Sequence, residues 1–165
     1  MSKGIRKVLC ASYAKGKYLY FMIAVALLFV PTYQVGAKDF LTIGFSMSLT
    51  GKYAAGAAGQ MQAYMLWQDI VNRQGGIFVK KYKKKLPVKF VYYDDRSDAN
   101  TAVRVYEKLI TEDKVDLLLS PYGTTIHFAV VPITEKYKVP LIGSTAASIK
   151  LRKIKAKYFW FITSC

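Results

Sequence analysis

The sequence predicts an α/β fold in which a parallel sheet is flanked by helices. From residue 40 onward, short apolar runs alternate with segments whose apolar residues recur at helical spacing, which is the pattern of βαβ units. Just over half of the residues are apolar, enough to bury one core of ordinary size. We therefore expect a globular domain and not a disordered tail.

Five short apolar runs have the composition of buried strands. They are Leu41–Met47, Pro87–Tyr93, Asp116–Leu119, Pro140–Ile142 and Tyr158–Ile162. Because helical patterns separate these runs, the strands are expected to pair in parallel through crossover helices. We expect the last strand, Tyr158–Ile162, at or near one edge of the sheet.

The first helix is expected between the first two strands. Four of its apolar residues recur at i, i+3, i+4 and i+7 and so form one apolar face: Ala63, Leu66, Trp67 and Ile70. The pair Gly75-Gly76 supplies the stop signal of this helix. The helix also contains Trp67, a large residue in its C-terminal half.

Two further helices are expected downstream. The first begins with Ser97 or Asp98 as its N-cap, and its apolar residues keep helical spacing at Ala102, Val105, Tyr106 and Leu109. The second begins near Thr124 or Thr125. It contains Pro132, which removes one backbone hydrogen bond and is expected to kink the axis.

Residues 1–37 have the layout of a secretory signal peptide. Five basic residues precede an apolar run from Tyr18 to Val30, and the small-residue sequence Val35-Gly36-Ala37 follows. The run has about 13 residues, whereas a helix that crosses a membrane needs roughly 20. We expect cleavage after Ala37, a periplasmic mature protein, and contact with the membrane only during export.

The charge and the cysteines indicate no further chemistry. Beyond residue 37 the chain has twenty basic and ten acidic residues, a surplus that can attract nucleic acid or anionic lipid. The densest basic cluster, Lys80–Lys85, lies between a helix pattern and a strand pattern, so we interpret it as a solvated loop and expect no nucleic-acid partner. Cys10 and Cys165 are too far apart in sequence to suggest a metal site or a redox pair.

Three of the loops that follow strands are rich in small and hydroxyl residues. They read SMSLTGKYAAGAAG after the first strand, SPYGTTIH after the third and GSTAAS after the fourth. In open α/β sheets, ligands bind beyond the carboxyl ends of the strands, where free amides at a helix start suit a carboxylate or phosphate. The same residues also make helix caps and turns without any ligand. The loops alone leave both interpretations open.

Together these segments resemble the periplasmic binding proteins for leucine, isoleucine and valine, the type I solute receptors of ABC importers. The matching stretches are IGFSMSLTGKYAAGAAGQ, IVNRQGGI, VYYDDRSDANTAVRVYEKLITEDKVDLLLSPYGTT and VPLIGSTAASIKLR, in the order and spacing of that family. The resemblance implies two Rossmann-like lobes with the ligand between them. Residues 38–165 would then be an incomplete first lobe, because a complete member is more than twice as long.

The resemblance also implies a set of ligand-binding residues. The ligand carboxylate would be held at two helix starts, by Thr124 or its neighbour Thr125 and by the loop from Thr145 to Ser148. A threonine usual in amino-acid binders falls on Ala147, so its hydroxyl is absent unless Ser148 replaces it. Tyr53 lies near a position whose side chain covers the ligand, and Tyr122 either stacks on the ligand or packs in the core. The acidic partner of a ligand ammonium would lie in the second lobe.

Two other groups of polar residues receive structural interpretations. Asp94, Asp95 and Asp98 are close enough to share a cation, but the resemblance makes them a strand-end turn and a helix cap. His127 is the only histidine, and we interpret it as a surface residue of a helix. No arrangement of nucleophile and base can be argued around it.

The expected function is therefore capture of a small solute, an amino acid or a related carboxylate, for delivery to the membrane subunits of an ABC importer. An enzyme is disfavoured, because the sequence shows no nucleophile–base pair, phosphate loop or dinucleotide fingerprint. We expect no catalytic residues, no metal and no cofactor. The alternative is a ligand-sensing domain of a receptor or regulator, since one fold can serve several functions.

Overall fold

The computed structural model of the chain describes residues 38–162, and the signal segment predicted at residues 1–37 lies outside them. Strands and helices alternate in the order β1 (Leu41–Met47), α2 (Ala54–Arg73), β2 (Ile77–Val79), β3 (Lys84–Leu86), β4 (Val88–Asp94), α3 (Ala99–Thr111), β5 (Leu117–Leu119), α4 (Thr124–Tyr137), β6 (Leu141–Gly143), α5 (Ile149–Arg152) and β7 (Phe159–Phe161). Within this range, no helix combines the length and the apolar character needed to cross a membrane.

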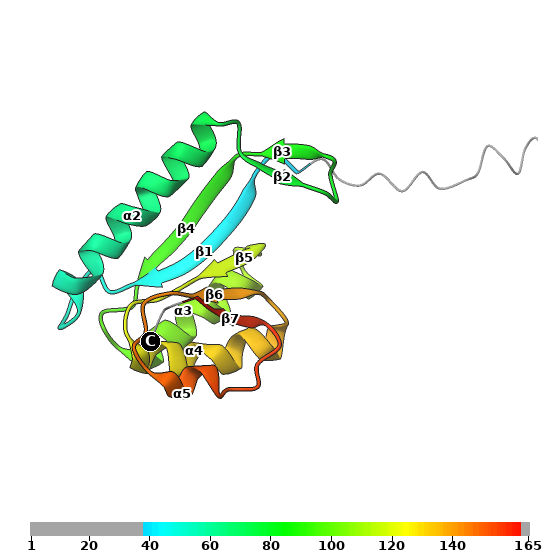
Figure 1. The fold of residues 1–165 in the computed structure, drawn as a ribbon. Coiled ribbons are helices and arrows are strands. Elements are labelled where there is room, and N and C mark those ends of the chain that lie inside the picture. The colour runs from blue at the N-terminus through cyan, green and yellow to red at the C-terminus, as the bar shows by residue number, and fades with distance from the viewer. Residues whose placement is uncertain (1–37, 163–165) are drawn as a thin grey trace, which may run out of the picture. The chain divides into compact units, whose positions relative to one another are not determined.

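Five strands form one parallel sheet in the order β4-β1-β5-β6-β7 (Figure 1). The longest pairing joins β1 and β4, from Leu41 opposite Val88 to Met47 opposite Asp94. All five predicted strands are confirmed to within one residue at each end, and β7 lies at an edge as expected. The prediction of a Rossmann-like parallel sheet flanked by helices is thus confirmed.

A small antiparallel hairpin, formed by β2 and β3, is not predicted by the sequence pattern. Ile77 lies opposite Leu86, and Val79 lies opposite Lys84. The basic cluster Lys80–Lys85, interpreted above as a loop, makes the exposed turn of this hairpin and the first two residues of β3. Both strands have only three residues, which is too short for apolar alternation to show, and β3 begins with two lysines.

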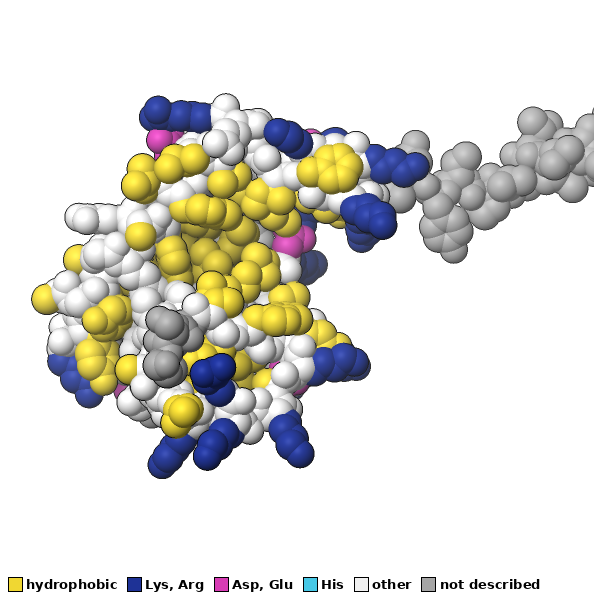
Figure 2. Space-filling view, in the orientation of Figure 1, with side chains coloured by type: hydrophobic (Ala, Val, Ile, Leu, Met, Phe, Trp, Pro, Cys, Tyr) yellow, Lys and Arg dark blue, Asp and Glu magenta, His cyan; other side chains and the backbone are white. Residues whose placement is uncertain are grey.

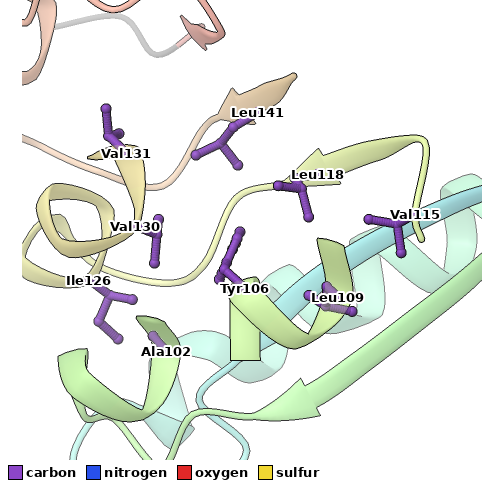
Figure 3. Packing of buried hydrophobic residues seen from close by; sticks show 9 residues of the cluster. All are labelled: Ala102, Tyr106, Leu109, Val115, Leu118, Ile126, Val130, Val131 and Leu141. Carbon is purple, nitrogen blue, oxygen red and sulfur yellow. The ribbon is translucent and has the colours of Figure 1, made fainter. Parts of the chain in front are cut away.

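The larger core lies between the sheet and the helices α3 and α4 (Figure 3). Its buried members are Ala102, Tyr106, Leu109, Val115, Leu118, Ile126, Val130, Val131 and Leu141. Tyr106 satisfies its hydroxyl by donating to the carbonyl of Leu119 at 2.6 Å. The apolar spacing predicted for α3 therefore identifies the residues that face the core.

The predicted starts of α3 and α4 are confirmed. Asp98 is the N-cap of α3, where its Oδ1 accepts a hydrogen bond from the amide of Thr101 at 2.7 Å. Helix α4 begins at Thr124 and contains Pro132, as expected. The glycine pair after α2 also has its predicted role, because Gly75 and Gly76 both adopt positive φ just beyond the end of that helix.

Helix α2 lies over β4 and β1, on the face of the sheet opposite to α3 and α4 (Figure 1). The apolar face predicted for it is not the face that packs on the sheet: Leu66 is 60% exposed and Ile70 is 46% exposed. The side of the helix that faces the sheet makes both apolar and polar contacts, and Ala57, Met61 and Tyr64 belong to the cluster around Phe45 and Met47. Asn72 exchanges two hydrogen bonds with the backbone of Val88, at 2.7 and 2.9 Å, and Gln68 donates to the same carbonyl at 3.0 Å.

Part of the sheet on the α2 side carries no covering helix among the described residues. On this face Leu119 lies opposite Ile142, and Ile142 lies opposite Trp160, so three neighbouring strands present apolar side chains side by side. Trp160 is 50% exposed. Figure 2 shows hydrophobic side chains gathered in a hollow in this view. An exposed apolar surface of this kind promotes association.

We therefore expect the purified protein to self-associate through this surface. Light scattering on residues 38–165 should give a mass above that of one chain. Trp160→Lys should shift the mass toward that of a monomer, because it adds a charge to the apolar surface. Phe78→Lys adds a charge to the exposed hairpin residue Phe78 and is the matched control. A wild-type monomer, or an equal effect of the control, would contradict the prediction.

Candidate ligand-binding site

An open pocket of about 420 Å³ lies where the loops after β5 and β6 meet. Its size is in the range of pockets that hold small organic ligands. The lining residues are Tyr122, Gly123, Thr124, Ser144, Thr145, Ala146 and Ala147. The two loops are neighbours because β5 and β6 pair in parallel, with Leu118 opposite Leu141. The pocket is therefore at the carboxyl edge of the sheet, where ligands of open α/β sheets bind.

Direct hydrogen bonds tie the two loops together. The amide of Gly123 donates to the carbonyl of Thr145 at 3.1 Å, and the amide of Ala147 donates to Oγ1 of Thr124 at 3.0 Å. Gly123 is the N-cap of α4 and has a φ of 92°, a conformation that glycine adopts without strain. Glycine has no side chain to cap the helix, so the amides of the first turn of α4 are not capped by this residue.

The buried hydroxyl of Ser120 is bonded to several of the residues that form the pocket. The amides of Ser144 and Thr145 approach Ser120 Oγ at 3.2 and 3.4 Å. On its other side, Ser120 Oγ lies 2.7 Å from Nε2 of His127, whose Nδ1 lies 2.8 Å from the carbonyl of Gly123. A carbonyl only accepts, so Nδ1 carries the proton and a neutral His127 accepts the Ser120 hydroxyl at Nε2.

The expectation that His127 is a surface residue is wrong, because its side chain is completely buried. Burial lowers the pKa of His127 below its ordinary value, and the hydrogen bond to the carbonyl of Gly123 opposes this shift in part. The structure also forms a Ser–His pair that the sequence did not suggest. Ser120 is itself completely buried, so this pair serves as a structural contact and does not present a nucleophile to the pocket.

Helix α2 is joined to the same hydroxyl network through Gln60. Its Nε2 donates to the carbonyl of Ser120 at 3.0 Å, and its Oε1 accepts from Oγ1 of Thr145 at 2.9 Å. Tyr64, one turn later, donates to the Ser120 carbonyl at 3.2 Å. Sequence reasoning missed this role. A signal was present, since Gln60, Tyr64, Gln68 and Asn72 recur every four residues along one side of the helix.

The structure brings four of the seven predicted site residues into the lining of the pocket: Tyr122, Thr124, Thr145 and Ala147. Thr125, Ser148 and Tyr53 do not line it. Ser148 is the N-cap of α5 and accepts from the amide of Lys150 at 3.3 Å, so its hydroxyl has a structural partner. Tyr53 precedes α2, and its ring centroid lies 6.2 Å from that of Tyr122.

Three aspartates, Asp94 at the end of β4 with Asp95 and Asp98 after it, form the turn and cap that the sequence indicated. Asp95 is buried and accepts from the hydroxyls of Ser46 and Ser48, each at 2.7 Å. Asp94 accepts from the hydroxyl of Thr50 at 2.6 Å, which holds the loop after β1. All three carboxylates therefore have hydrogen-bond partners that stabilise loops. Over residues 38–162, no group of three potential metal ligands is close enough to hold an ion.

No charged side chain belongs to the pocket lining. The polar groups that face it are hydroxyls and backbone amides, which bind an anion through neutral donors. Thr124 Oγ1 already accepts from the amide of Ala147, so its own hydroxyl proton can be donated to a ligand. The arrangement can hold one small anionic group.

The buried neutral His127 predicts that acid destabilises the fold. The unfolded chain binds a proton near the ordinary pKa of 6.5, whereas the lowered pKa keeps the folded His127 neutral. Its contribution to stability is full above pH 6.5 and is lost as the pH falls from there toward the folded pKa. Unfolding free energy should decrease by up to about 1.4 kcal/mol per pH unit in this window.

Urea denaturation between pH 7 and pH 5 measures this effect. His127→Gln keeps a polar side chain that does not titrate, so its unfolding free energy should vary less with pH than that of the wild type. Equal pH dependence of the two proteins would show that His127 does not change its protonation on unfolding.

Residues 41–164 match the family model described as periplasmic binding protein. Similar folds occur in several solved structures. The branched-chain amino acid transporter substrate-binding protein LivJ from Streptococcus pneumoniae, in complex with isoleucine, is 27% identical, with a TM-score of 0.66 over 74% of this chain and 33% of its own. A solute-binding protein of an ABC transporter from Rhodopseudomonas palustris, in complex with benzoate, is 25% identical, with a TM-score of 0.61 over 74% of this chain and 32% of its own.

The chain thus spans about a third of the length of these solved relatives. The part that matches is the sheet with its flanking helices, including the two loops that form the pocket. On the strength of this match, which covers most of the sequence, the chain belongs to the periplasmic binding protein family.

Proposed function

We propose that residues 38–165 form the first lobe of an extracytoplasmic receptor that captures a small solute for an ABC importer. The family match and the fold support this role, and the ABC transporter proteins among the solved relatives suggest the partner. Residues 1–37 would export the protein, and a second lobe would close over the ligand. The membrane subunits of the importer would then receive the solute.

The observation that carries the proposal is the chemistry of the pocket. The start of α4, with its hydroxyl donor Thr124 and its glycine N-cap, faces a loop that contributes only small or hydroxyl side chains. A helix N-terminus favours a negative group, because its amides point outward and the helix dipole is positive there. The pocket therefore suits a ligand whose carboxylate is the only charged group that reaches this lobe.

The ligands of the two relatives agree with a carboxylate as the common feature. Isoleucine, bound to the Streptococcus protein, and benzoate, bound to the Rhodopseudomonas protein, both contain a carboxylate and share no other polar group. In this chain Ala147 contributes a methyl group to the pocket, while its backbone amide is bonded to Thr124 Oγ1, and no acidic side chain in the lining can pair with a ligand ammonium. Any such pairing would come from the second lobe.

The role of Thr124 can be tested in a fusion of this lobe to the second lobe of a family member. Thr124→Ala removes a hydrogen bond to a charged group, which is worth roughly 1.5–3 kcal/mol, so affinity should fall about tenfold to a hundredfold. Calorimetry with isoleucine and with benzoate measures the change for whichever ligand binds.

Lys80→Ala, in the hairpin turn, is the matched control and should leave the affinity unchanged. It is preferred to a change at Lys83, which has a positive φ of 52° and would add backbone strain as alanine. An unchanged affinity in Thr124→Ala would assign the contact to another residue, such as Thr125 or Ser148, or reject a carboxylate pocket at this helix start.

A further inference from the structure

Tyr122 is the one aromatic residue that lines the pocket. It follows Ser120 by two residues and immediately precedes Gly123, the N-cap of α4. Its ring is not free to leave the site, since Tyr122 also packs against the smaller core cluster of Phe45, Met47 and Ala57. The pocket thus has an aromatic side chain whose other side rests on the folded core.

The position of the Tyr122 ring depends on a glycine in the first turn of α2. A Cβ atom placed on Gly56 would lie 2.3 Å from the hydroxyl oxygen of Tyr122 and 2.7 Å from its Cζ. The hydroxyl end of the ring therefore occupies the space left by the missing side chain. Gly56 has no positive φ that would require glycine, so this close contact is the structural reason for a glycine in a helix at this site.

A second aromatic ring supports the first. Tyr53 lies beside Tyr122 with ring centroids 6.2 Å apart and planes tilted by 56°, an arrangement that aromatic pairs favour. The rest of the lining offers the methyl groups of Ala146 and Ala147, and the hydroxyls lie at Thr124, Ser144 and Thr145. The pocket therefore combines anion donors with an aromatic surface and has no charged group for a second polar end of the ligand.

We propose that Tyr122, seated against Gly56, makes this pocket selective for carboxylates that carry a flat aromatic group over carboxylates that carry a saturated one. This proposal rests on the proposed function, because it names the class of solute that the same pocket receives. A flat ring can pair with the Tyr122 ring in offset or edge-to-face geometry while its carboxylate reaches the start of α4. A saturated ring of the same size gains only the apolar contact.

Benzoate and cyclohexanecarboxylate are the probes, since they share the carboxylate and the ring size and differ in aromaticity. We expect ligand-observed NMR titrations of the purified protein, at millimolar ligand, to show about two- to tenfold tighter binding of benzoate. Gly56→Ala should reduce this ratio toward one by displacing the Tyr122 ring, and alanine is the better helix former, so the fold should be retained. Tyr122→Leu should reduce the ratio in the same way.

Gly59→Ala is the matched control, because it makes the same change one turn later in α2, where a new Cβ would meet nothing within 4 Å. The control should keep the wild-type ratio. Equal binding of the two probes, or a ratio that Gly56→Ala leaves unchanged, would overturn the selectivity while the proposed carboxylate receptor stands. Failure of both probes to bind would overturn this inference, while the proposed function, in which a second lobe closes over the ligand, is tested separately by Thr124→Ala in the two-lobe fusion.

Discussion

The buried hydroxyl of Ser120, just after β5, joins the loop after β6 to helix α4 behind the pocket. This one oxygen lies within 3.4 Å of the amides of Ser144 and Thr145 and within 2.7 Å of His127. The carbonyl of the same residue accepts hydrogen bonds from α2 through Gln60 and Tyr64. Helix α2, helix α4 and the loop after β6 are thereby all bonded to Ser120.

The hydrogen-bond donors that face the pocket are uncharged. The buried polar atoms bond to one another, and over residues 38–162 no buried side-chain nitrogen or oxygen lacks a partner. What faces outward is the hydroxyl of Thr124 and the start of α4, which attract an anion through dipoles. Under the proposed function, these donors bind the carboxylate of the ligand and make no charged contact with the rest of it. The neighbouring side chains, which include Tyr122 and Ala147, then determine which group attached to the carboxylate fits the pocket.

Local signals in the sequence predicted most of the fold. The alternation of apolar runs located five strands to within one residue. The pair Ser97 and Asp98 marked the start of α3, because a helix cap depends on residues next to it in the sequence, and the structure assigns the cap to Asp98. The rotation of α2 could not be predicted in this way. Its most regular apolar face, which includes Leu66 and Ile70, is exposed, since hydrogen bonds of Asn72 to a distant strand fix the other side of the helix.

The sequence likewise predicted only part of the candidate site. The loops around Thr124 and Thr145 were predicted from glycine and hydroxyl residues that follow strands, and they do line one pocket. The burial of His127 and the central position of Ser120 were not predicted, because both arise from contacts between segments that the sequence separates. The sequence around a single histidine in a helix does not indicate which hydroxyl its ring contacts in the folded protein.

Amide hydrogen exchange in a Ser120→Ala variant tests most directly whether this hydroxyl holds the pocket together. The account predicts that the amides of Ser144 and Thr145 exchange at least about tenfold faster than in the wild type, because each loses its acceptor. The amide of Thr101, which is bonded to Asp98 at the start of α3, should keep its wild-type rate and report that the fold is intact. Unchanged exchange at Ser144 and Thr145, with the pocket still formed, would contradict the account.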